Sequence, residues 1–142
     1  MSIDLAGNLS LVLSIASLFL LILGIPLVRD LKSAENFRRH GYLTIVALAI
    51  EAILVFIVMI PSFTNNFDVV LSLSPLSALN TWLHVGLGVV AEVAGFVYVV
   101  MWLAFSPSTM QCIRFRRYMM PTFIIWIIAV ISGTLIHLLK LF

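Results

Sequence analysis

The sequence predicts an all-α integral membrane protein, a four-helix up-down bundle that takes up the whole chain. Of its 142 residues, 63% are hydrophobic and 10% are charged, whereas about a quarter of the residues in a soluble domain are charged. Four apolar stretches of about 20 residues, the length that crosses a bilayer, lie between the few charged segments. Because none of them alternates polar and apolar residues as a barrel strand does, each is expected to be a helix.

The helices are expected at residues 8–28, 41–60, 79–105 and 119–141. Pro26 lies near the end of the first helix and Pro121 near the start of the fourth, where proline is better tolerated than at mid-helix. Ser77 or Asn80 is expected to cap the third helix. The connections are short, so consecutive helices are expected to be antiparallel.

The composition also excludes several classes of protein. A net charge of +2 spread over short connections makes no basic face, so nucleic acid is not expected as a partner. The single cysteine, Cys112, cannot form an internal disulfide, and no cysteine cluster suggests an iron–sulfur or zinc site. The first ten residues carry no Lys or Arg before the apolar run, so the first helix is expected to be retained rather than cleaved as a signal peptide.

The basic residues predict how the helices are oriented. The second connection has none. The first and third connections contain Arg29, Lys32, Arg38, Arg39, Arg114, Arg116 and Arg117. By the positive-inside rule both basic connections face the cytoplasm and both termini lie outside, with Lys140 as a mild exception. The expected location is the plasma membrane of a prokaryote, with the lipid bilayer as the surrounding partner.

Two histidines inside the spans suggest a haem. His84 and His137 are each expected about 7 Å from the outer face, on consecutive antiparallel helices. Imidazoles at equal depth on facing helices suit a bis-histidine b-type haem. Gly88 follows His84 by four residues and Gly133 precedes His137 by four, so both small residues reach the layer where a macrocycle needs room. The alternative is ordinary helix packing, with each histidine bonded to a lipid headgroup or a neighbouring helix.

Two carboxyls are expected near the middle of the membrane. Glu51 lies about 16 Å from the inner face and Glu92 about 20 Å from the outer face. If their faces meet, they could share a proton and serve a proton or cation path, or compensate the charge of haem iron. The alternative is a structural one, a protonated Glu bonded to a serine or a backbone carbonyl. Separately, Ser10, Ser14 and Ser17 recur at helical spacing and predict a packing face of the first helix.

His40 opens the second helix after two arginines, and two interpretations are open for it. The preferred one is an interfacial residue in a basic connection near anionic lipid. The other is a ligand to a second haem or a metal on the cytoplasmic side. No other histidine is expected at that depth, which leaves Cys112 as a candidate partner.

Three segments carry a resemblance to a known family. They are RRHGYLTIVALAIEAILVFIVMI (residues 38–60), LHVGLGVV (83–90) and RRYMMPTFIIWIIAVISGTLIHLL (116–139). Together they look like the four-helix membrane family catalogued as domain of unknown function 420, some of whose members are implicated in maturation of haem-containing terminal oxidases. In that family one histidine opens the second helix and another lies in the third, matched here by His40 and His84.

The last helix resembles the family too, and two positions depart from it. Pro121, Trp126 and Gly133 match a proline, a tryptophan and a glycine of the family's last helix. The family tends to carry a further histidine before that helix, where this chain has residues 114–117, and His137 stands where an aromatic residue is expected. The pairing of His84 with His137 would therefore be particular to this protein.

These observations favour a membrane b-type haem protein for one-electron transfer, an electron carrier or accessory subunit rather than a stand-alone enzyme. A respiratory complex, an oxidase subunit or a quinone is the expected partner. One alternative, which the resemblance favours, is an assembly factor for a haem-containing terminal oxidase. The other is a structural accessory subunit of a membrane complex. No signature of a hydrolase, a phosphate-binding loop or a zinc metalloprotease occurs in the sequence.

Overall fold

The computed structural model describes residues 3–29, 34–104 and 109–138, and within these ranges every regular element is a helix. Four helices are long: α1 (Ile3–Arg29), α2 (Ala34–Leu54), α5 (Pro75–Ala104) and α6 (Thr109–Leu138). Between α2 and α5 lie the π-helical turn η1 (Val55–Met59) and the short helices α3 (Ile60–Asn65) and α4 (Phe67–Ser72). The predicted all-α class with several long apolar helices is confirmed.

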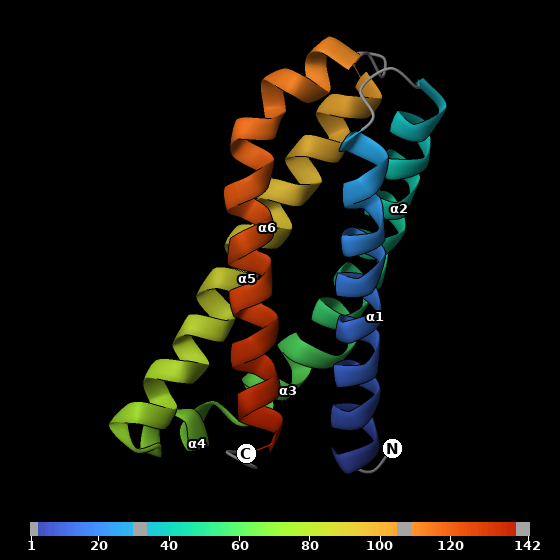
Figure 1. Cartoon of the computed structure of the whole chain (residues 1–142). Helices are drawn as coiled ribbons and strands as arrows, with labels where there is room; N and C mark the ends of the chain where they lie inside the picture. Colours follow the sequence, from blue (N-terminus) through green and yellow to red (C-terminus); the bar gives the residue numbers. More distant parts are fainter. Residues whose placement is uncertain (1–2, 30–33, 105–108, 139–142) are drawn as a thin grey trace.

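The long helices associate as two pairs. The most extensive contacts join α1 to α2 and α5 to α6, while the contacts of α2 with α5 and of α1 with α6 are fewer. Both termini lie at one end of the molecule, beside α3 and α4 (Figure 1). We name this the terminal end. The opposite end, where α1 and α5 finish and α2 and α6 begin, is the connection end.

Four segments are long and apolar enough to cross a membrane: Gly7–Leu27, Glu35–Asn65, Pro75–Ala104 and Arg117–Leu138. Many large apolar side chains on them point outward; Phe56, for example, is 70% exposed and Phe96 64%. A contiguous surface of this kind is unfavourable in water and suits contact with lipid tails. The interior is correspondingly thin, and its apolar cluster consists of Leu21, Ala47, Leu48, Ala91 and Trp126.

The second span is longer than the sequence predicts. Residues 61–78 were expected to form a connection, but η1 and α3 continue α2 as far as Asn65. Pro61 explains the π-helical turn, because proline has no N–H to continue the α-helical ladder. Just before it, the N–H of Ile60 bonds to Val55 O, five residues back.

The third and fourth helices also begin earlier than expected. α5 starts at Pro75 rather than residue 79, and neither Ser77 nor Asn80 caps it. The side chain of Ser74 does so instead, since its Oγ accepts the Ser77 N–H at 3.4 Å, and Pro75 suits the first helical turn. α6 starts at Thr109, so Arg114, Arg116 and Arg117 lie on a helix and not in a loop.

The thin interior makes a prediction about packing. Ala47 is 0% exposed, whereas Ala49, two residues along α2, is exposed. Replacing Ala47 by Leu should destabilise the protein by about 1–3 kcal/mol, because the added atoms have no space. Thermal unfolding in detergent would measure the change. The matched variant Ala49→Leu should stay within about 0.5 kcal/mol of wild type, and equal effects of the two variants would contradict the packing described.

Candidate functional site

The most buried carboxyl of the described residues is Glu51, on α2. It is 7% exposed and faces two serines of α1. The hydroxyl of Ser17 forms a short hydrogen bond with Glu51 Oε1, and Ser14 Oγ lies 3.5 Å from Oε2. The same Ser17 hydroxyl lies 2.9 Å from the carbonyl oxygen of Ser14. The serine stripe of the first helix is therefore a packing face, as predicted, and it also binds a carboxyl.

Two ionisable groups of α5 come close to this carboxyl. Glu51 interacts electrostatically with both His84 and Glu92. Among the described residues, the carboxyl that pairs with a Lys or Arg is that of Glu35, which forms a salt bridge with Arg39 on the exposed surface. Glu51 has no such pair within the described ranges. The structure therefore brings together the two carboxyls that the sequence places at similar depth, and it adds an imidazole to them.

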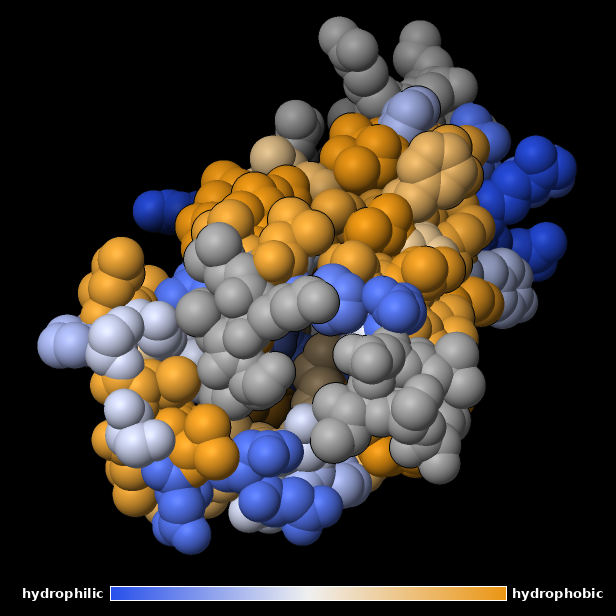
Figure 2. Space-filling model, turned by 90° about the horizontal axis from the view of Figure 1, so that it is seen from below, coloured by the Kyte–Doolittle hydropathy of each residue, from blue (hydrophilic) through white to orange (hydrophobic). Residues whose placement is uncertain are grey.

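Open space lies beside these groups at Gly88. Its neighbours on the same face of α5, Thr81, Ala91 and Gly95, are buried. A Cβ atom added to Gly88 would nevertheless meet no heavy atom within 4 Å. A view onto the terminal end shows a hollow between the helices (Figure 2). The inner face of α5 thus carries a stripe of His84, Gly88 and Glu92 that is not fully covered.

His84 is held against α6. Its Nδ1 lies 2.8 Å from the carbonyl oxygen of Ala129, and because a carbonyl only accepts, Nδ1 carries the proton and Nε2 is left as the acceptor. A Cβ on Gly133 would lie 2.6 Å from His84 Cε1. One turn away, Asn80 Nδ2 donates to Ser132 O at 3.1 Å. Gly133 therefore makes room for the imidazole itself.

His137 is held against α1 instead. Its Nε2 lies 3.0 Å from Asn8 Oδ1, and a Cβ on Gly7 would lie 3.2 Å from its Nδ1. The two histidines of the predicted haem pair thus contact different helices, His84 contacting α6 and His137 contacting α1. The haem at this pair stays a prediction.

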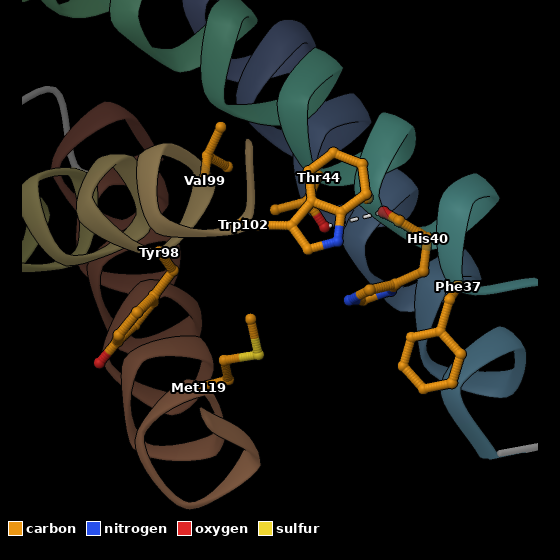
Figure 3. A pocket seen from close by; sticks show the side chains of 8 residues that line it. Phe37, His40, Thr44, Tyr98, Val99, Trp102 and Met119 are labelled. Atoms are coloured by element: carbon orange, nitrogen blue, oxygen red, sulfur yellow. Dashed lines mark hydrogen bonds between the residues drawn. The ribbon is translucent and has the colours of Figure 1, made fainter. Parts of the chain in front are cut away.

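His40 lies near the connection end, between α1 and the other pair of helices. Its Nδ1 lies 3.0 Å from Gly24 O, and a Cβ on Gly24 would lie 2.7 Å from that nitrogen. The other side of the ring borders a cavity of about 30 Å³ (Figure 3). The lining comes from α2, α5 and α6: Phe37, His40, Gly41, Thr44, Tyr98, Val99, Trp102 and Met119.

Several partners of these groups were not anticipated from the sequence. Asn8 and Met119 are the main ones, and each becomes a neighbour only when helices distant in the chain pack together. Ser14 and Ser17 were singled out by their spacing on one helix face, but not as the partners of Glu51. Two residues considered earlier, the side chain of Cys112 and Lys140, lie outside the described parts of the chain.

Comparison of the chain with protein-family models, curated proteins and solved structures finds no match. The resemblance to the oxidase-maturation-linked family stays a prediction.

The contact between Gly133 and His84 makes a second prediction. In Gly133→Ala the new Cβ would stand 2.6 Å from Cε1 and 2.8 Å from Nδ1 of a ring that is held by its hydrogen bond to Ala129. We expect the ring to be displaced and the protein to lose about 1–3 kcal/mol of stability, measured by thermal unfolding in detergent. The control is Gly86, because a Cβ added there would meet no heavy atom within 4 Å. Gly86→Ala should leave stability unchanged or raise it by up to about 1 kcal/mol. A stable Gly133→Ala variant would refute the contact.

Proposed function

We propose that this chain is an integral membrane protein that takes up and releases protons at Glu51. The observation that carries the proposal is the Ser14–Ser17–Glu51 arrangement. A serine hydroxyl has one proton, yet Ser17 Oγ is within hydrogen-bond distance of both the Ser14 carbonyl and Glu51 Oε1. Both contacts are satisfied when Ser17 donates to the carbonyl and Glu51, in its acid form, donates to Ser17.

An acid form is also what the surroundings favour. A charged carboxylate between apolar helices is costly unless a cation pairs with it, and Glu51 has serine hydroxyls rather than Lys or Arg as its hydrogen-bond partners. Its resting state would be neutral. Ionisation would require a compensating positive charge, which the nearby His84 can provide by accepting a proton at Nε2.

The groups around Glu51 are suited to passing such a proton on. His84 and Glu92 lie on one stripe of α5, and both interact electrostatically with Glu51. Gly88, one turn from each of them, has open space beside its Cα, and a water molecule there would help to connect groups that do not touch directly. The proposal therefore assigns Glu51 as the central proton carrier, with His84 and Glu92 as its exchange partners.

The proposal includes a topology. The four long helices would form an up-down bundle in the plasma membrane of a prokaryote, with the connection end in the cytoplasm and both termini outside. Arg38, Arg39 and Arg117 lie at or near the connection end, on α2 and α6, and this asymmetry of basic residues supports the orientation.

A b-type haem is the second candidate, and one observation favours it. His84 donates Nδ1–H to a backbone carbonyl, which is the usual way a metal-ligating histidine is oriented while its Nε2 stays available. His137 fits less directly, because its Nε2 is engaged with Asn8. Haem b, when bound, would supply one-electron transfer, with a respiratory complex, an oxidase subunit or a quinone as partner. The assembly-factor and accessory-subunit hypotheses need no such ligand.

Proton uptake at Glu51 can be measured in reconstituted vesicles. With an inside-negative potential imposed, wild-type protein should acidify the interior, read with an enclosed pH-sensitive dye. Glu51→Gln should lower the protein-dependent rate by about tenfold or more, because the amide keeps the shape of the carboxyl but cannot release a proton. The control is Glu35→Gln, which removes an exposed carboxyl of the same helix and should leave the rate unchanged.

An infrared spectrum tests whether Glu51 is protonated, independently of whether the vesicles show proton transport. At neutral pH the wild-type-minus-Glu51→Gln difference spectrum should show the carbonyl stretch of a protonated carboxyl, which separates Glu51 from Glu92, and this band should shift in Ser17→Ala because the hydroxyl partner is lost. If Glu51 is ionised at neutral pH, the difference band is absent and the proposal fails, whatever the vesicles show.

The haem candidate has its own test. The reduced-minus-oxidised visible spectrum of the purified, haem-supplemented protein should show b-type bands, lost in both His84→Ala and His137→Ala. Bands that survive in His137→Ala would place the second ligand elsewhere. A colourless wild type would remove the candidate and leave the proton-handling proposal standing alone.

A further inference from the structure

The cavity beside His40 has the composition of a metal site. It lies at the connection end, where α2, α5 and α6 meet, away from Glu51. Its lining contains one imidazole, one thioether and aromatic rings, and no carboxyl group. Its volume of about 30 Å³ admits an ion or a water molecule, whereas an organic ligand needs several hundred Å³.

The imidazole is oriented as a ligand. His40 Nδ1 donates to the carbonyl oxygen of Gly24, which fixes the tautomer and leaves the lone pair of Nε2 free. Gly24 is required for this approach, because a Cβ there would stand 2.7 Å from Nδ1. A backbone carbonyl of α1 thus holds the ring of α2 from behind.

The thioether faces the same space from another helix. Met119 projects from α6 and His40 from α2, and their side chains point toward one another across the cavity (Figure 3). Trp102 of α5 borders the same space. It packs so closely on Gly41 that a Cβ there would lie 2.5 Å from Trp102 Cζ2. Two glycines therefore shape the cavity, one behind His40 and one under Trp102.

We propose that this cavity binds Cu(I), with His40 Nε2 and Met119 Sδ as ligands and the indole of Trp102 closing the site. Thioether sulfur is a soft ligand that selects Cu(I), and imidazole also suits copper. Hard divalent ions prefer carboxylate and carbonyl oxygen, and none of the lining side chains described has either group; Thr44 and Tyr98 have hydroxyl groups only. A cation against the indole face gains further electrostatic attraction. This site is independent of the function proposed for Glu51.

Among the described residues, no three His, Cys, Asp or Glu side chains come close enough together to hold a metal ion, and the proposed site differs from such a cluster in its ligands. His40 contributes one ligand of that kind, and the second is a methionine. From the sequence, Cys112 was the candidate partner of His40 in a metal site; the packing of α6 against α2 and α5 places Met119 at the same cavity instead.

The test is a Cu(I) titration of the full chain in detergent under reducing, oxygen-free conditions. All variants carry Cys112→Ser, because the only thiol of the chain would bind Cu(I) on its own. Affinity is measured by competition with a chromophoric Cu(I) chelator, and tryptophan fluorescence reports whether the ion reaches Trp102. We expect one Cu(I) per chain with quenched fluorescence.

Met119→Leu is the decisive variant, since it keeps the apolar volume and changes stability little while removing the sulfur. It should weaken Cu(I) binding by about tenfold or more and abolish the quenching, and His40→Gln should do the same. Met120→Leu is the matched control, because Met120 is the next residue and is 49% exposed; its affinity should equal that of the Cys112→Ser parent. Circular dichroism confirms that each variant keeps its helices.

Two results would overturn the site. One is a Cys112→Ser parent that takes up no Cu(I). The other is a Met119→Leu variant that binds Cu(I) as tightly as that parent, which would place the ion at a different sulfur or at none.

Discussion

Polar groups inside a membrane helix must find partners within the protein, because lipid tails offer none. This constraint sets how the helices of this chain face one another. Several polar side chains on the long helices reach across to a neighbouring helix. Four such links are Glu51 with Ser17, His84 with Ala129, His40 with Gly24 and His137 with Asn8. Since apolar association is weak as a driving force between helices in lipid, these links define which faces meet.

The histidine links share a second feature, a glycine on the facing helix. His40 packs where Gly24 has no side chain, His84 does so at Gly133, and His137 lies against Gly7. A ring brought this close can bond to the backbone of the neighbour, as the first two do. The contact then fixes which ring nitrogen carries the proton. At His40 and His84 the glycine of the facing helix therefore sets two things: how closely the helices approach, and which ring nitrogen is left without a backbone partner.

The division of the long helices into two closely packed pairs separates two kinds of site. Glu51 and its serines lie within the pair of α1 and α2, and the stripe of α5 meets them from the other pair, where contacts are fewer and Gly88 faces open space. The cavity beside His40 also lies where the pairs meet, but nearer the connection end. Groups that exchange protons or bind ions need access, and the looser contact between the pairs provides it.

The sequence by itself determined the helical class and the presence of four apolar segments long enough to cross a membrane, since both follow from composition and length. It also singled out Glu51, Glu92 and the histidines, because ionisable groups are rare in such segments. The continuation of α2 through η1 and α3 to Asn65 escaped it, because the predicted second helix ended at residue 60, before Pro61.

Only the tertiary structure decided which groups face one another. Spacing along one helix fixes a residue's depth and its direction relative to its own helix, but not how far that helix is rotated against the next. That rotation directs His84 toward α6 and His137 toward α1, although the sequence places them at the same depth. It likewise brings Ser17 to Glu51 and Met119 to the cavity of His40. Those pairings depend on side chains of helices far apart in the chain, and no pattern within one helix contains them.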